Sequence, residues 1–209
     1  MLSDLIDLTN SKEFFDNLSI STKALRMTRF TFEMDFYIFN DLTEQVLFEC
    51  SLQARGLGYS AESRMIETGV GYKQINLYEN HPILWNYQTS QYFILHGPVD
   101  DLPSLLGELY LVHQQVSGNW INFHSLVFGM SKRLNTAQET GIELPEPLIK
   151  SYLTIFQKHN LSYTPKNLRK NDGQYKTLIV GNEAITTNEL NLGQPYIIAQ
   201  QFSATVTAL

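Results

Sequence analysis

Four side chains in the middle of the chain are of the types that transfer protons in enzymes. They are His96, Asp100, His113 and His124. An imidazole paired with a carboxylate can act as a general acid or base, so these four residues are the catalytic candidates. None of their spacings matches the short His and Cys motifs that hold zinc, and we expect no metal and no cofactor. The alternative of an enzyme with general acid/base chemistry therefore stays open.

His113 has unusual neighbours for a catalytic residue. On a helix of about 3.6 residues per turn it belongs to an apolar stripe. The other members of this stripe are Leu102, Leu105, Leu106, Leu109 and Val116. A histidine on such a stripe is most often a core residue whose ring is bonded to a backbone carbonyl. We expect His113 to be buried, neutral and hydrogen-bonded through at least one ring nitrogen.

Cys50 is the single cysteine of the chain, so no intrachain disulfide can form. It follows the alternation of an apolar strand face, between Phe48 and Leu52. A thiol in that position is expected to be buried and inert, because a nucleophilic cysteine needs an exposed and electropositive site.

Aromatic side chains supply a second kind of candidate site. Phe, Trp and Tyr make up 12% of the chain. The ligand-binding candidates are Tyr37, Phe39, Trp85, Tyr87 and Tyr92, which could line a cavity under a curved sheet or simply form core. This surplus, and the lack of a nucleophile motif, favour a non-catalytic binding or accessory module. Such a module would use an aromatic concavity or a sheet edge to bind a protein partner or an apolar small ligand.

The elements that position these candidates lie between residues 81 and 116. Residues 83–87 alternate as an extended strand would, and residues 92–95 are apolar on both faces. The second pattern is typical of a strand that is buried on both sides. Residues 102–116 are expected to form the helix that carries His113, with Asp100-Asp101 as its N-terminal cap.

Upstream of that region, alternating polar and apolar residues predict a long antiparallel hairpin over Leu25–Arg55. Its first strand is expected to run without interruption from Leu25 to Phe39. The expected buried face holds Phe32, Met34, Phe48 and Cys50. The register is strongly specified, because a slip of one residue would expose that whole set.

The expected fold is α+β, with a curved, mainly antiparallel β-sheet of about six strands and helices packed on one face. A single α+β domain is expected to cover residues 1–209. Its parts are N-terminal helices in 1–20, the sheet in 25–96, helical cover in 101–160 and closing strands in 177–206. The polar segment 160–176, with a basic cluster in 166–176, is expected to be a connecting loop.

Composition narrows the function classes further. Twenty-one acidic and 15 basic residues give a net charge of −6, which disfavours nucleic acid and anionic membrane surfaces as partners. No apolar run approaches the roughly 20 residues that span a bilayer, and the first residues are acidic where a signal peptide is basic. We expect a soluble, cytoplasmic protein, and the sequence allows a homodimer. No motif assigns the chain to a family.

Overall fold

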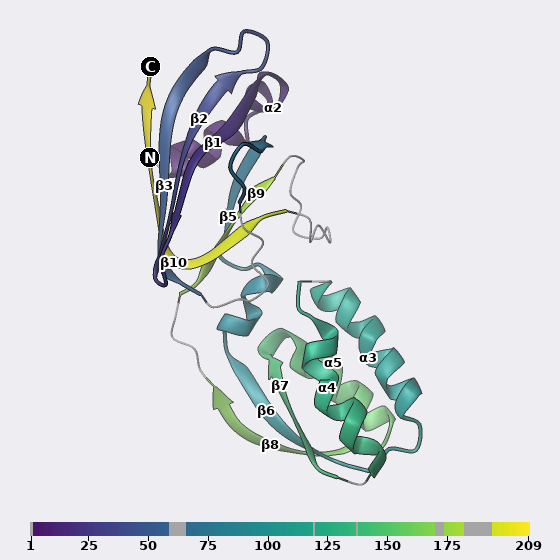
Figure 1. The fold of residues 1–209 in the computed structure, drawn as a ribbon. Helices are drawn as coiled ribbons and strands as arrows, with labels where there is room; N and C mark the ends of the chain where they lie inside the picture. Colours follow the sequence, from purple (N-terminus) through teal and green to yellow (C-terminus); the bar gives the residue numbers. More distant parts are fainter. Residues whose placement is uncertain (1, 59–65, 119, 137, 170–173, 182–193) are drawn as a thin grey trace. The chain divides into compact units, whose positions relative to one another are not determined.

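The structure, a computed structural model, describes residues 2–58, 66–118, 120–136, 138–169, 174–181 and 194–209 (Figure 1). The chain divides into two compact units, Met1–His81 with Gln174–Leu209 and Pro82–Gly173. Helices and mostly antiparallel strands make up both, so the predicted α+β class with a curved antiparallel sheet is confirmed. That the two units act as the single domain expected from the sequence stays a prediction.

The first unit is built on a seven-stranded antiparallel sheet in the order β4-β1-β2-β3-β10-β9-β5. Its described elements are α1 (Leu2–Thr9), α2 (Lys12–Asn17), β1 (Leu18–Met27), β2 (Thr31–Asn40), β3 (Val46–Leu57), β4 (Gly71–Tyr72), β5 (Gln74–Tyr78), β9 (Lys176–Gly181) and β10 (Tyr196–Ala208). Strands β4 and β5 are neighbours in the chain, yet β4 pairs with β1 and β5 with β9, at opposite ends of the order. The sheet therefore curls until it is nearly closed.

Lys73 lies where the two ends of this sheet meet. Its backbone N–H donates to the carbonyl of Gly181 in β9 at 2.9 Å. Its ammonium donates to the carbonyl of Leu18 in β1 at 2.9 Å and also pairs with Asp41. A single residue thus bonds to strands from both ends of the sheet, which holds the curl in place.

The predicted hairpin register is confirmed. Strands β2 and β3 pair antiparallel, with Phe36 opposite Cys50 and Ile38 opposite Phe48. Phe32, Met34 and Cys50 are buried, and Phe48 is half-buried against the same core. Every member of the predicted buried face therefore lies on the core side.

The single strand predicted over Leu25–Phe39 is wrong, because a tight turn separates β1 from β2. The hydroxyl of Thr28 accepts hydrogen bonds from the backbone N–H groups of Phe30 and Thr31, at 3.2 and 3.0 Å. A threonine that bonds backbone groups two and three residues on favours a turn over a continuous ladder. Strand β1 also begins at Leu18, inside the range 1–20 that was expected to be helical.

Helices α1 and α2 pack on the buried face of the curled sheet. Leu5 of α1 and Phe14 of α2 are completely buried in the core that the strands form. The hydroxyl of Thr9, also fully buried, bonds to both the N–H and the carbonyl of Ile75 in β5 at 3.3 Å. The helices thus fill the inside of the curl, where apolar side chains of the strands converge.

The second unit is a three-stranded antiparallel sheet in the order β7-β6-β8, covered by helices on one face (Figure 1). Its described elements are the short 3₁₀ helices η1 (Pro82–Tyr87) and η2 (Leu134–Thr136), the strands β6 (Ser90–His96), β7 (Thr140–Pro145) and β8 (Ser162–Arg169), and the helices α3 (Leu102–Ser117), α4 (Phe123–Arg133) and α5 (Glu146–Lys158). The predicted helix over residues 102–116 is confirmed, and Asp101 caps it by accepting from the Ser104 N–H at 3.0 Å.

Three expectations for this unit are wrong. Residues 83–87 belong to η1 instead of a strand. Strand β6 is buried on one face only, since Phe93 is 2% exposed but Tyr92 is 43% exposed. The segment expected to be a loop forms β8 over residues 162–169, and residues 170–173 lie outside the described part of the chain. Strand β8 is polar because nearly all of its side chains are exposed, so its sequence lacks the apolar alternation of a half-buried strand.

Phe36→Ala is expected to lower the free energy of unfolding by about 3–5 kcal/mol, because it removes a fully buried ring from the curled core. Tyr37→Ala on the opposite face of β2 is the control and should cost about 1 kcal/mol. Urea denaturation followed by circular dichroism measures both. Equal costs for the two variants would show that Phe36 is not a core residue.

Candidate functional site

His113 is completely buried, and both of its ring nitrogens are bonded. Nε2 lies 2.8 Å from the backbone carbonyl of Ile121, and Nδ1 lies 2.9 Å from the Tyr152 hydroxyl. A carbonyl can only accept, so Nε2 carries the proton and Nδ1 accepts from Tyr152. Burial lowers the pKa of His113. These contacts confirm the core interpretation of His113, which ties α3 to α5 and to the segment before α4.

Cys50 is 2% exposed, as expected from its place in the strand alternation. Burial raises the pKa of its thiol to about 11. The thiolate form that would act as a nucleophile is therefore scarce at neutral pH.

Asp100 and His124 are exposed, in different parts of the second unit. Asp100 precedes the cap of α3, and the ring of His124 lies edge-on to Phe128 with 5.6 Å between ring centroids. Among the described residues, no hydrogen bond or ring contact joins Asp100, His113, His124 and His96 to one another. The structure does not assemble the four sequence candidates into one cluster.

His96 instead meets two side chains that the sequence did not indicate. Its Nδ1 lies 2.9 Å from Glu139 Oε1, and its Nε2 lies 2.7 Å from Thr164 Oγ1. Because the carboxylate can only accept, the neutral ring carries its proton on Nδ1 and accepts from the Thr164 hydroxyl through Nε2. In this arrangement the carboxylate orients the imidazole, and the imidazole can take the proton of the hydroxyl. Enzymes activate a nucleophilic hydroxyl in this way. Glu139 lies 43 positions and Thr164 lies 68 positions after His96 in the chain, so no local sequence pattern could have predicted this contact.

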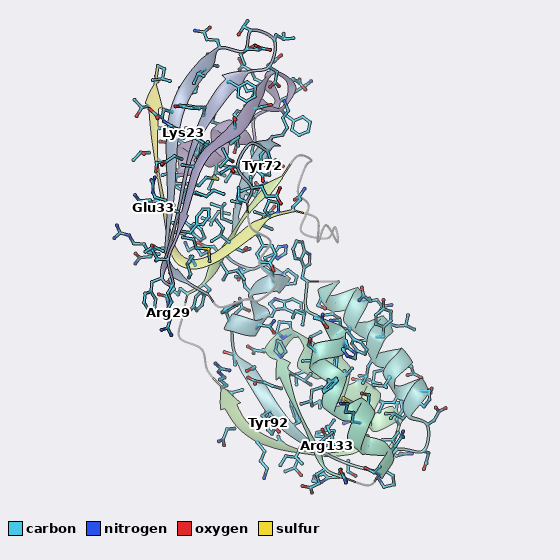
Figure 2. The ribbon with its side chains drawn as sticks, viewed as in Figure 1. Lys23, Arg29, Glu33, Tyr72, Tyr92 and Arg133 are labelled. Carbon is cyan, nitrogen blue, oxygen red and sulfur yellow. The ribbon has the colours of Figure 1, made fainter. Side chains whose placement is uncertain are left out.

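The five aromatic candidates are divided between the two units. Tyr37 and Phe39 lie in β2, and the Nζ of Lys23 lies 4.9 Å from the centroid of the Tyr37 ring. Trp85 and Tyr87 lie in η1. Tyr92 lies in β6 and is labelled in Figure 2. The binding of an apolar small ligand by these residues stays a prediction.

The free edge of β10 is a further candidate site, and it consists of residues 201–208. Before it, Tyr196–Ala199 pairs with β9. From Gln201 to Ala208 the strand pairs with β3 on one side. No described residue pairs with the other side of this stretch, which lies at the margin of the sheet beside β3 (Figure 1).

One hydrogen bond shows which backbone groups face the free edge. The N–H of Leu209 donates to the carbonyl of Leu47, beyond the end of β3, at 3.1 Å. In an antiparallel ladder, alternate residues direct their N–H and C=O groups to opposite sides. Counting back in twos from Leu209, the odd-numbered residues bond to β3. Phe202, Ala204 and Val206 therefore direct their backbone groups outward, along the free edge.

A hollow with a cavity volume of about 510 Å³ lies at the start of the free edge. Its polar lining is Arg55, Lys176, Gln200, Gln201 and Ser203, and its apolar lining is Leu2, Leu77 and Phe202. Lys176 is paired with Glu79, whereas no carboxylate of the described residues forms an ion pair with Arg55. The guanidinium of Arg55, together with the paired Lys176 and several neutral donors, favours an anionic group with an apolar portion.

No protein-family model, curated protein or solved structure matches this chain. Its function is therefore argued from the geometry of its own sites. None of the helices that the structure describes has the length and apolar character to cross a membrane. In the same part of the chain, no group of three or more His, Cys, Asp or Glu side chains could hold a metal ion.

The buried state of His113 predicts a pH dependence of stability. Burial lowers the pKa of His113 in the folded protein below its ordinary value of 6.5. As the pH falls below 6.5, the imidazole therefore binds a proton in the unfolded chain before it does so in the folded protein. The stabilisation is complete above about pH 6.5 and falls at lower pH, by at most about 1.4 kcal/mol per pH unit. His113→Leu should be less stable than the wild type at pH 7, because it leaves Tyr152 and Ile121 without their buried partner.

Urea unfolding at pH 7 and pH 5 tests this expectation. The difference in unfolding free energy between wild type and His113→Leu should shrink toward pH 5. A difference that is the same at both values would show that the ring titrates alike in the folded and unfolded states.

Proposed function

We propose that this protein is a binding module that takes an extended segment of a protein partner as an additional strand along the free edge of β10. The observation that carries this proposal is the pairing of β10, which leaves residues 201–208 with a partner on one side only among the described residues. A strand bonded on one side presents a row of backbone donors and acceptors that fits another strand.

The side chains of this edge do not obstruct such pairing. Residues 196–209 contain no charged residue and no proline. Exposed sheet edges are usually protected by charges, especially lysine, or by proline. The lack of either device, over a stretch long enough for several backbone bonds, supports an edge that is used for binding.

Val206→Pro tests strand addition. It removes an outward N–H and places the proline ring beside the free edge, while the N–H groups that bond to β3 remain. The probe is a decapeptide selected on the wild-type protein from a random library and labelled with fluorescein. Its affinity, measured by fluorescence anisotropy, should fall at least tenfold with Val206→Pro.

Val206→Ala is the matched control, because it trims the same side chain and keeps the N–H. It should bind the probe like the wild type, and circular dichroism should show the same fold for both variants. Binding by Val206→Pro that equals binding by Val206→Ala would contradict strand addition.

A second candidate function, an enzyme, is supported by the row of Glu139, His96 and Thr164. His96 can take the hydroxyl proton of Thr164 while Glu139 stabilises the imidazolium. The side chains of His96 and Glu139 are 35% and 67% exposed, so a substrate carbonyl could reach the row from solvent. Thr164 Oγ1 would attack the carbonyl carbon of an ester and pass its proton to His96, and the C–O bond to the alcohol would break as His96 returns that proton to the leaving alcohol. Water would then hydrolyse the acyl-threonine and release the acid.

A fluorophosphonate tests this candidate, because it bonds covalently to an activated hydroxyl with loss of fluoride. Mass spectrometry should locate the adduct on Thr164, and His96→Gln should slow its formation by about 10²-fold or more. Thr154, an exposed threonine of α5 whose hydroxyl donates to the Lys150 carbonyl, is the internal control. Labelling that is absent, or equal at Thr154 and Thr164, would exclude the enzyme.

A further inference from the structure

We propose that the hollow at the start of the free edge binds a C-terminal carboxylate, so that the partner is an extended peptide that runs antiparallel to β10 and ends there. This inference rests on the proposed strand addition, and it specifies the chemistry and direction of the added strand. The carboxylate would lie against Arg55 and Lys176, and the side chain of the last peptide residue would lie among the apolar lining.

The direction follows from the position of the hollow along β10. The free edge begins at Gln201 and continues toward Ala208, and the hollow is lined by residues 200–203 at its beginning. A strand antiparallel to β10 runs from the Ala208 end to the Gln201 end, so its C-terminus arrives at the hollow. Strand β9, which pairs with the preceding part of β10, is also antiparallel to it.

The charge of the hollow matches a carboxylate. Arg55 pairs in register with Gln201 across the ladder, so the two side chains project from the same face of the sheet. The guanidinium offers five N–H donors in a planar fork that fits the two oxygens of a carboxylate, and no carboxylate of the described residues forms an ion pair with it. Lys176, whose ammonium is also paired with Glu79, adds a second cation that the bound carboxylate would share with Glu79, and the amides of Gln200 and Gln201 add neutral donors.

The size of the hollow indicates that more than the carboxylate enters it. Its volume of about 510 Å³ falls within the range of about 300–1,000 Å³ that is usual for ligand pockets. Leu2 of α1 and Leu77 of β5 line it together with Phe202. An apolar last residue would bury its side chain against these three, so we expect peptides that end in residues such as Leu, Val or Phe.

The experiment selects peptides from a random library displayed with a free C-terminus. Each selected peptide is then synthesised as the free acid and as the C-terminal amide. Fluorescence anisotropy on the full chain should show that the amide binds about tenfold more weakly or worse, as the loss of a charge-assisted pair predicts. Arg55→Gln should weaken the free acid by a similar factor and leave the amide unchanged, and Lys176→Gln should act in the same direction.

Arg133→Gln is the matched control, because it removes an exposed arginine from α4 in the second unit, and it should not change either affinity. Equal binding of acid and amide, with binding still sensitive to Val206→Pro, would overturn carboxylate capture and leave strand addition standing. Full binding by Val206→Pro would overturn strand addition and this inference with it. A library that yields no binding peptide would overturn both.

Discussion

The architecture of the first unit depends on one short connection. The two edge strands of its sheet, β4 and β5, are adjacent in the sequence. Only Lys73 separates β4 from β5, yet these strands pair with β1 and β9, which lie far apart in the strand order. The sheet must curl to bring both partners within reach, and the bonds of Lys73 to Leu18 and Gly181 hold it there. The curl creates the enclosed core that α1 and α2 fill, because apolar faces of seven strands turn toward one another.

Strand β10 is paired on both sides only near its start. Strand β9 begins at Lys176, opposite Ala199, so its pairing with β10 does not continue beyond that residue. Past that point β10 stays bonded to β3, and its outer side is left with backbone groups that water or another strand must satisfy. The hollow lies where the pairing of β10 with β9 ends, and it is lined by residues of α1, β3, β5, β9 and β10. In the proposed complex, backbone pairing along β10 would supply the affinity for the added peptide strand. The cations of the hollow would fix the direction in which that strand runs.

The core of the second unit contains two buried polar side chains that are bonded to each other. Three helices cover one face of a small sheet, and their shared core includes His113 and Tyr152, whose polar atoms bond to each other. Because the ring of His113 also donates to Ile121, no polar atom of the imidazole is left unpaired in the core. The opposite face of the sheet has no helical cover among the described residues. Polar side chains can therefore gather on it, as His96 does with Glu139 and Thr164.

The sequence by itself determined what depends on local periodicity. Alternation placed Phe32, Met34 and Cys50 on the buried face, and helical spacing placed His113 in the core. The tertiary structure decided what depends on pairing between distant segments. Residues 162–169 form a strand because β6 pairs with them, although their polar sequence resembles a loop. Thr164 reaches His96 across that pairing, and Arg55 of β3 and Lys176 of β9 line the same hollow because the sheet curls. Strand register and sheet curvature bring these residues together although they are far apart in the sequence. Local periodicity therefore could not predict these contacts.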